Sequence, residues 1–167
     1  MILDTSCFYR LTNGYLDANT ALDVNADGSG RLTMATTGDF SGQFWKPVDL
    51  GGGKYAFQTL YLGDDFSLDI INDGVNATPC LAQTGNYSGQ HWSIAQWDDG
   101  ACKLTNDFTG PTKSLDTSSD THAPLMGTGD HSGQHWTLTK IAKVQNNAPI
   151  PPLSEGKCVQ IGGPNRL

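Results

Sequence analysis

A six-residue motif occurs three times in this chain and decides its fold. The copies are Phe40-Ser41-Gly42-Gln43-Phe44-Trp45, Tyr87-Ser88-Gly89-Gln90-His91-Trp92 and His131-Ser132-Gly133-Gln134-His135-Trp136. Each copy contains the triplet Gln-x-Trp, and successive tryptophans are 47 and 44 residues apart. Self-similarity at a period of this length is the signature of a repeat architecture, in which each unit buries its apolar face against its neighbours.

Two further blocks precede each copy of the motif, always in the same order. A leucine followed by an aspartate gives Leu22-Asp23, Leu68-Asp69 and Leu115-Asp116. An opening block gives Tyr9-Arg10-Leu11-Thr12-Asn13, Tyr55-Ala56-Phe57-Gln58-Thr59 and Cys102-Lys103-Leu104-Thr105-Asn106. Three blocks repeated three times predict structural units at about residues 8–48, 54–95 and 101–142.

The pattern inside each unit favours short strands. In the first unit, the apolar residues Leu11, Leu22 and Leu32 alternate with polar ones at a period near two, which is typical of half-buried strands. Turn dipeptides such as Asn13-Gly14 and Asp99-Gly100 separate the stretches. No segment keeps a helical period, so we expect about four strands and no helix in each unit.

Three units of four strands predict an all-β chain folded as a β-trefoil with pseudo-threefold symmetry. A propeller is the alternative, but propellers have four or more blades. We expect the trefoil to occupy residues 1–143. Residues 144–167 contain Pro149, Pro151 and Pro152 and read as a proline-rich linker or tail, because proline favours extended backbone.

Composition excludes several classes of partner. The 167 residues carry 10 basic and 17 acidic side chains, a net charge of −7, and no cluster of Lys or Arg that nucleic acid would require. No apolar run is long enough to insert into a membrane. The first residues lack the features of a signal peptide. Together with the tail, this favours a domain of a larger extracellular, secreted protein, covalently linked to a catalytic or toxin domain.

The four cysteines leave two interpretations. Cys7 could pair with Cys158, with Cys80 and Cys102 as the remaining pair, or all four could be free thiols.

The three Gln-x-Trp triplets and their upstream Leu-Asp blocks resemble the ricin-type (R-type) lectins and the family 13 carbohydrate-binding modules over residues 8–142. The resemblance implies that each triplet Trp is core and that each Gln links a loop to a strand. It also implies that Asp23, Asp69 and Asp116 accept hydrogen bonds from adjacent sugar hydroxyls. An ionised carboxylate suits this task because it offers two acceptor oxygens. The alternative is that each aspartate caps a hairpin turn.

The sequence departs from the family pattern in two places. An aromatic residue that often stacks on the sugar is replaced by Ala35, Ala82 and Met126, and an Asn before the triplet Gln is replaced by Gly42, Gly89 and Gly133. Other aromatic residues in the adjoining loops could substitute. The predicted carbohydrate-binding residues are Asp23, Phe40, Gln43, Asp69, Asn72, Tyr87, Gln90, His91, Asp116, His131, Gln134 and His135. The second unit has the richest set. Recurring aromatics at Tyr15, Tyr61 and Phe108 are expected in the core.

The function predicted from these residues is non-catalytic carbohydrate binding at up to three weak sites. The partner would be a mono-, oligo- or polysaccharide, and three sites on one body would gain by avidity. No catalytic residue, metal site or cofactor is predicted. The segment Asp23–Gly28 matches half of a calcium loop, but Met34 stands where the bidentate Glu would be. The alternative function is a protein-interaction or inhibitor-type trefoil, favoured if the three aspartates are buried in hairpin hydrogen bonds.

Overall fold

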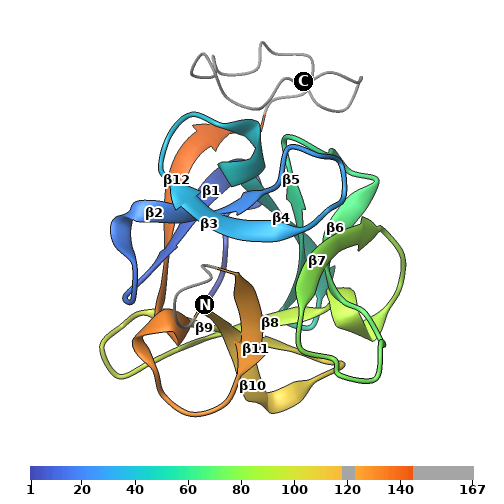
Figure 1. The fold of residues 1–167 in the computed structure, drawn as a ribbon, viewed down its shortest axis with the longest axis vertical. Coiled ribbons are helices and arrows are strands. Elements are labelled where there is room, and N and C mark those ends of the chain that lie inside the picture. Colours follow the sequence, from blue (N-terminus) through green and yellow to red (C-terminus); the bar gives the residue numbers. More distant parts are fainter. Residues whose placement is uncertain (118–122, 145–167) are drawn as a thin grey trace.

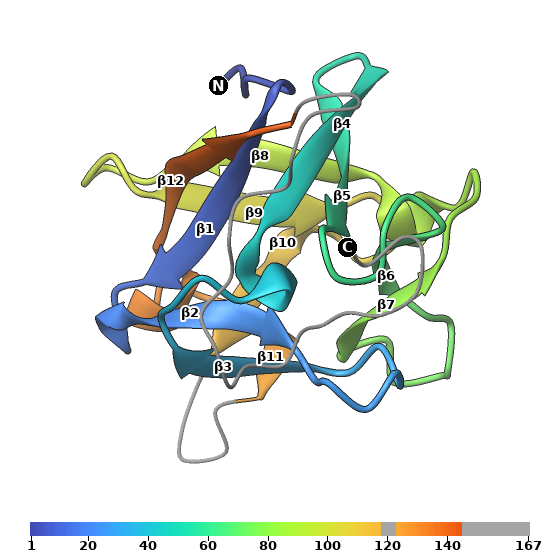
Figure 2. The same ribbon diagram turned by 90° about the horizontal axis from the view of Figure 1, so that it is seen from above.

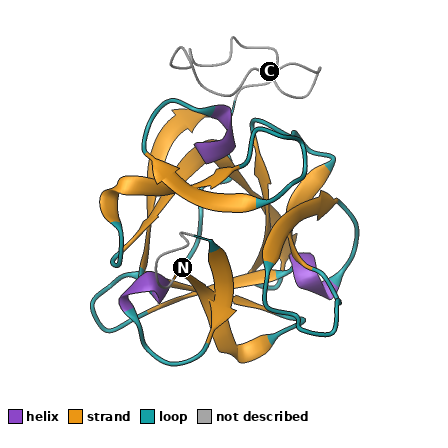
Figure 3. Ribbon diagram, in the orientation of Figure 1, coloured by secondary structure: helices purple, strands orange, loops and turns teal. Residues whose placement is uncertain are grey.

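The chain forms three consecutive groups of four strands, each with one short 3-10 turn (Figures 1 and 3). The structure is a computed structural model, and it describes residues 1–117 and 123–144. The first unit has β1 (Cys7–Asn13), β2 (Asp17–Val24), β3 (Leu32–Thr36), η1 (Ser41–Gln43) and β4 (Trp45–Gly51). The second has β5 (Lys54–Thr59), β6 (Phe66–Ile70), β7 (Pro79–Gln83), η2 (Ser88–Gln90) and β8 (Trp92–Gln96). The third has β9 (Cys102–Asn106), β10 (Gly110–Thr117), β11 (Pro124–Gly127), η3 (Ser132–Gln134) and β12 (Trp136–Lys143). The predicted tail lies outside the described residues except for Val144.

Six of the strands close into a barrel. Antiparallel pairing runs from β1 to β4, β5, β8, β9 and β12, and β12 pairs back to β1. The other six strands form three hairpins, β2–β3, β6–β7 and β10–β11. Figure 2 shows β2, β3 and β11 gathered at one end of the barrel. Closure leaves each barrel strand paired on both sides, which removes exposed sheet edges.

The three units repeat the same contacts, so they are related by a pseudo-threefold axis. The tryptophan that opens the last strand of each unit pairs with the first strand of that unit: Trp45 with Tyr9, Trp92 with Tyr55, and Trp136 with Cys102. Strands β3, β7 and β11 contact one another in pairs around the axis. The all-β, pseudo-threefold architecture that the sequence predicts is confirmed.

The triplet tryptophans hold each hairpin to the barrel. Trp45, Trp92 and Trp136 are completely buried. The indole N–H of each donates to the carbonyl of the leucine in the Leu-Asp block of its own unit, at 3.0, 3.0 and 2.8 Å. A buried indole needs such a partner, because an unpaired N–H in the core is costly. The prediction that these residues are core is confirmed.

The prediction that the units contain no helix is wrong in one respect. Each Ser-Gly-Gln segment forms a single 3-10 turn, drawn as a short helix in Figure 3. The amides of Gln43, Gln90 and Gln134 donate to the carbonyls three residues earlier, at 2.8–2.9 Å. Three residues are too few to produce a helical period in the sequence.

The described cysteines are not bonded to one another. Cys7, Cys80 and Cys102 are free thiols, so the pairing of Cys80 with Cys102 is wrong. Cys158 lies outside the described residues. Burial, together with the charges of Asp69 and Asp73, raises the pKa of the Cys80 thiol to about 11, which keeps it protonated at neutral pH. Within 1–117 and 123–144, no helix has the length and apolar character needed to cross a bilayer.

Replacing Trp92 with alanine tests the role given to the triplet tryptophans. We expect Trp92→Ala to lower the free energy of unfolding by about 3–5 kcal/mol, because it leaves a large cavity and an unpaired Leu68 carbonyl. Urea denaturation followed by circular dichroism measures the change. The exposed Leu50→Ala is the control and should change stability little. A loss for Trp92→Ala as small as that of the control would contradict the role.

Candidate functional site

Each Leu-Asp aspartate lies beside the 3-10 turn of its own unit. Asp23, Asp69 and Asp116 are the penultimate residues of β2, β6 and β10, and they are only 5%, 7% and 3% exposed. In each, Oδ2 accepts a hydrogen bond from the triplet glutamine Nε2, at 2.9–3.0 Å. The sequence led us to expect outward-facing carboxylates. Instead, they are more than nine-tenths buried and take part in the packing of the hairpins.

The triplet glutamines are structural in all three units. Gln90 accepts from the Gly85 amide at 3.1 Å and donates to the Gln83 carbonyl at 2.8 Å, in addition to its bond to Asp69. Gln43 makes the corresponding bonds to the Gly38 amide and the Thr36 carbonyl, whereas Gln134 donates to the Thr128 carbonyl and accepts from the Ser114 hydroxyl; all three side chains are buried. The expectation that Gln links loop to strand is confirmed. Their inclusion among the ligand contacts is corrected, because their amides are buried and engaged inside the protein.

The glycine before each glutamine allows this close approach. A Cβ at Gly89 would lie 2.3 Å from Asp69 Oδ1 and 2.4 Å from the Ile70 carbonyl. Corresponding clashes with the aspartate Oδ1, at 2.3 and 2.4 Å, would occur at Gly42 and Gly133. The asparagine expected from the family pattern cannot fit here. The backbone of the turn lies directly against the second carboxylate oxygen.

A hollow of about 460 Å³ lies over Asp69. The residues that line it include Asp69, Gly89, Ile71, Asn72 and Tyr87. Ile71 and Tyr87 are 49% and 59% exposed. The structure therefore brings together three predicted residues of the second unit, Asp69, Asn72 and Tyr87, between apolar walls.

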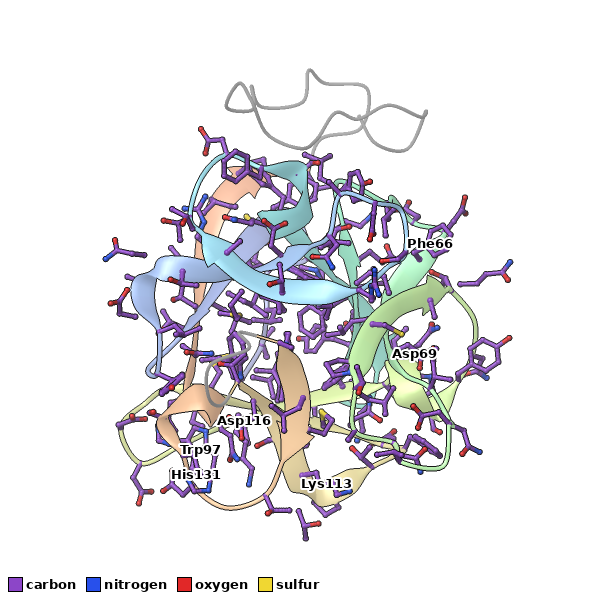
Figure 4. The ribbon with its side chains drawn as sticks, viewed as in Figure 1. Phe66, Asp69, Trp97, Lys113, Asp116 and His131 are labelled. Carbon is purple, nitrogen blue, oxygen red and sulfur yellow. The ribbon has the colours of Figure 1, made fainter. Side chains whose placement is uncertain are left out.

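A second hollow, of about 410 Å³, lies over Asp116, in a different lobe of the molecule (Figure 4). His131, Thr128 and Ser132 line it. Asp116 Oδ1 is buried and has no hydrogen-bond partner within the part of the chain that the structure describes. A buried acceptor without a partner is costly, and a ligand that donates a hydrogen bond would remove that cost.

Both hollows contain an aromatic residue that the sequence assigned to the core. Phe108 of the third unit lines the hollow over Asp69, and Tyr15 of the first unit lines the hollow over Asp116. Tyr15 is 47% exposed, so its placement in the core is wrong. Phe108 is half-buried at the edge of the core, whereas Tyr61 is buried as predicted. Barrel closure brings these residues beside a neighbouring unit, which a search within one repeat cannot reveal.

The aromatic residues at the start of the motif anchor their loops on glycines. A Cβ at Gly38 or Gly85 would lie 2.4 or 2.3 Å from a ring carbon of Phe40 or Tyr87. His131 packs less tightly on Gly129, with 3.0 Å to its Nε2. Phe40 is half-buried, while Tyr87 and His131 are exposed. Anchoring therefore leaves Tyr87 and His131 accessible beside their hollows.

The two triplet histidines have different surroundings, and their predicted role as sugar contacts stays a prediction. The nearest carboxylate to His91 Nδ1 is Asp107, at 3.8 Å, and His91 is not part of the hollow over Asp69.

His135 contacts Asp99 through Nδ1 (2.7 Å) and Asp130 through Nε2 (2.5 Å), and its ring stacks on Trp97 with centroids 4.6 Å apart. Both ring nitrogens are engaged within the protein, and a role for His135 as a sugar contact stays a prediction. Burial alone would lower the pKa of His135, but the two carboxylates together raise it above its usual range.

The comparisons with known proteins identify the fold. No family model matches the chain, and no curated protein matches it. Among solved structures, the designed three-fold symmetric protein ThreeFoil shares 24% identity at a TM-score of 0.66, over 80% of this chain and 99% of its own.

The chain is a β-trefoil. A mosquitocidal holotoxin contains a similar region, with a TM-score of 0.70 and 20% identity over 83% of this chain, which spans 18% of the toxin. A Polyporus squamosus lectin, solved with the epitope Neu5Acα2-6Galβ1-4GlcNAc, matches with a TM-score of 0.65 and 17% identity, over 83% of this chain and 50% of its own. These similarities show the β-trefoil fold that the repeats predict.

Removing a triplet glutamine tests the link between loop and hairpin. We expect Gln90→Ala to destabilise the trefoil by roughly 2 kcal/mol or more, because it leaves the Gly85 amide, the Gln83 carbonyl and Asp69 without a buried partner. Gln83→Ala, at an exposed side chain in the same hairpin, is the matched control. The measurement is the urea midpoint, and equal midpoints for the two variants would contradict this assignment.

The His135 cluster predicts a pH dependence of stability. Because the folded-state pKa of His135 is raised, its stabilising contribution is complete below the unfolded pKa of about 6.5 and is lost as pH rises through the folded value. The melting temperature of the native trefoil minus that of His135→Gln should therefore shrink from about pH 6 towards pH 8. A difference that is constant or grows over this interval would refute the prediction. His91→Gln, which removes the corresponding histidine of the second unit, is the control.

Proposed function

We propose that this trefoil binds carbohydrate without catalysis, at the hollow over Asp69 and at the hollow over Asp116. The observation that carries the proposal is a largely buried carboxylate among the residues that line an open hollow. At Asp116, that carboxylate has an oxygen without a partner among the described residues. A ligand that fits must present a hydrogen-bond donor to a buried anion, and sugar hydroxyls do so.

The hollow over Asp69 adds the other chemistry of a sugar site. Tyr87 and Ile71 offer exposed apolar surface on which the C–H face of a pyranose can pack. The exposed amide of Asn72 can both donate and accept at the rim. One lining therefore combines a charged acceptor with apolar side chains, which is the composition of small-molecule sites in general.

Each site is expected to be weak on its own. A monosaccharide has few atoms, and its hydroxyls exchange bonds with water for bonds with protein. Sites in separate lobes of one rigid body can engage a polymer or a glycan-covered surface together, which raises the overall affinity. The toxin and the lectin in the comparison support a role in holding an attached catalytic or toxin domain on a glycan. This use implies an extracellular location.

A protein-interaction trefoil is the second candidate, and one observation favours it. Ile71, Val75 and Tyr87 are 49%, 72% and 59% exposed in the second unit, and such side chains also suit a protein partner. The burial of the three aspartates points the same way. The two candidates differ in whether a free glycan binds to the purified chain.

Exchanging Asp69 for asparagine gives the sharpest test of sugar binding. The oxygen of the introduced amide would still accept from Gln90, so its NH₂ group would take the place of Oδ1 and present a donor where the ligand needs an acceptor. We expect Asp69→Asn to fold normally and to lose at least about tenfold in affinity for glycans that bind the native chain. Glycan-array binding followed by titration calorimetry measures this loss.

The matched control is Asp73→Asn, which removes the same charge from the neighbouring exposed turn. Tyr87→Ala should weaken the same glycans. If no glycan binds the native chain, or if Asp69→Asn and Asp73→Asn bind equally well, the proposed site is wrong. Binding of a protein, with no glycan bound, would instead select the second candidate.

A further inference from the structure

An aromatic residue from a turn of the next unit adjoins each unit, and the three aromatic residues differ in how far they are buried. Phe108 lines the hollow over Asp69 and Tyr15 lines the hollow over Asp116. By the pseudo-threefold symmetry, Tyr61 is the equivalent aromatic residue for the first unit, and its amide donates to the Ser41 carbonyl of that unit. The three side chains differ sharply in environment: Tyr15 is 47% exposed, Phe108 is half-buried, and Tyr61 is 6% exposed and belongs to the core cluster.

The same backbone contact brings each aromatic turn to its neighbour. The amides of Gly14, Leu60 and Asp107 donate to the carbonyls of His135, Phe44 and His91, all at 3.0 Å. These carbonyls belong to the middle residues of the triplets, so each turn is fixed against the 3-10 turn of the adjacent unit. Because all three units share this contact, it does not explain why Tyr15, Tyr61 and Phe108 differ in exposure.

The residue that ends the opening strand explains the difference. In the first and third units this residue is an asparagine. Asn13 Oδ1 accepts from the Tyr15 amide at 3.1 Å, and Asn106 Oδ1 accepts from the Phe108 amide at 2.8 Å. An Asx turn of this kind engages the amide two residues on. The backbone amide of the aromatic residue is therefore bonded within its own turn.

The second unit has Thr59 at this position, and its hydroxyl is one atom closer to the backbone. Thr59 Oγ1 accepts from the amide three residues on, Leu62, at 3.2 Å, as Asn13 Oδ1 also does from Leu16 at 3.1 Å. The amide of Tyr61 instead donates to the Ser41 carbonyl in η1, at 3.2 Å. This bond draws Tyr61 onto the turn that carries Gly42, whose backbone lies against Asp23. The side chain of Tyr61 then becomes buried.

We propose that these aromatic residues decide which carboxylates can meet a ligand. Phe108 and Tyr15 line the hollows at Asp69 and Asp116 and form part of those sites, whereas Tyr61 is drawn into the core and fills the equivalent position in the first unit, although the three carboxylates themselves are similarly buried. The nature of the ligand rests on the proposed function. The burial of Tyr61 at the first unit does not depend on it. The proposal makes Phe108, a residue of the third unit, a specificity-determining residue of the site in the second unit. It also makes Thr59 the positioning residue that prevents binding at the first unit.

The closure is tested without any ligand by tyrosine nitration with tetranitromethane, mapped by mass spectrometry. We expect Tyr15 and Tyr87 to react in the native chain and Tyr61 to be protected. Thr59→Asn should restore the Asx turn and make Tyr61 reactive, while Thr59→Ser, which keeps the hydroxyl, should leave it protected. Equal nitration of Tyr61 and Tyr15 in the native chain would overturn the proposal.

The number of sites is tested by amide chemical-shift mapping, with Neu5Acα2-6Galβ1-4GlcNAc and Galβ1-4GlcNAc as probes. We expect shifts around Asp69 and Asp116 but not around Asp23. Tyr61→Ala, which opens the position directly, should add shifts around Asp23, and Tyr61→Phe should not. Phe108→Ala should weaken binding at Asp69 by about five- to tenfold and leave Asp116 unchanged.

The possible failures are distinguishable. Shifts around Asp23 in the native chain, or no weakening by Phe108→Ala, would refute the role of the aromatics while leaving sugar binding intact. Absence of shifts with both probes, together with no binding to a glycan array, would refute the proposed function. The nitration result would then still decide whether Tyr61 closes the first unit.

Discussion

The hydrogen bond between the triplet glutamine and the Leu-Asp carboxylate is the interaction on which the rest of this structure depends. It occurs in every unit at 2.9–3.0 Å, and it joins the loop before the barrel strand to the hairpin that caps the barrel. The indole of the neighbouring tryptophan bonds to the carbonyl just before that carboxylate. One short motif therefore fixes hairpin, turn and barrel together. Three copies of this junction, related by symmetry, account for the closed fold.

This junction also constrains the binding sites. At Asp116, the oxygen that does not accept from glutamine has no partner among the described residues, whereas at Asp23 it accepts from the Val24 amide at 2.8 Å; both oxygens lie where water is largely excluded. The electrostatic attraction for a donor is strengthened there, because the local dielectric constant is lower than in water. The bond to glutamine also fixes the orientation of the carboxylate before a ligand arrives. In the proposed sites, the same residue would both stabilise the hairpin and present a pre-organised acceptor, although Asp69 and Asp116 are only 7% and 3% exposed.

The sequence predicted what depends on local repetition and missed what depends on contacts between units. The repeated blocks predicted the strands, the symmetry, the buried tryptophans and the linking role of the glutamines. They could not predict the burial of Asp69, which follows from the backbone of Gly89 lying against it. Nor could they predict that His135 lies between Asp99 and Asp130, because these carboxylates come from different loops. The one available signal for the unequal aromatics was Thr59, where the other units have asparagine.

A crystal structure of the chain with a bound glycan tests the central claim most directly. The account predicts a sugar hydroxyl within about 2.5–3.0 Å of Asp69 Oδ1, or of Asp116 Oδ1, while the glutamine bond to Oδ2 is retained. A glycan seated away from both carboxylates would contradict it. So would a glycan that contacts an aspartate only after the glutamine has been displaced, because the carboxylate would then not be pre-organised by the fold.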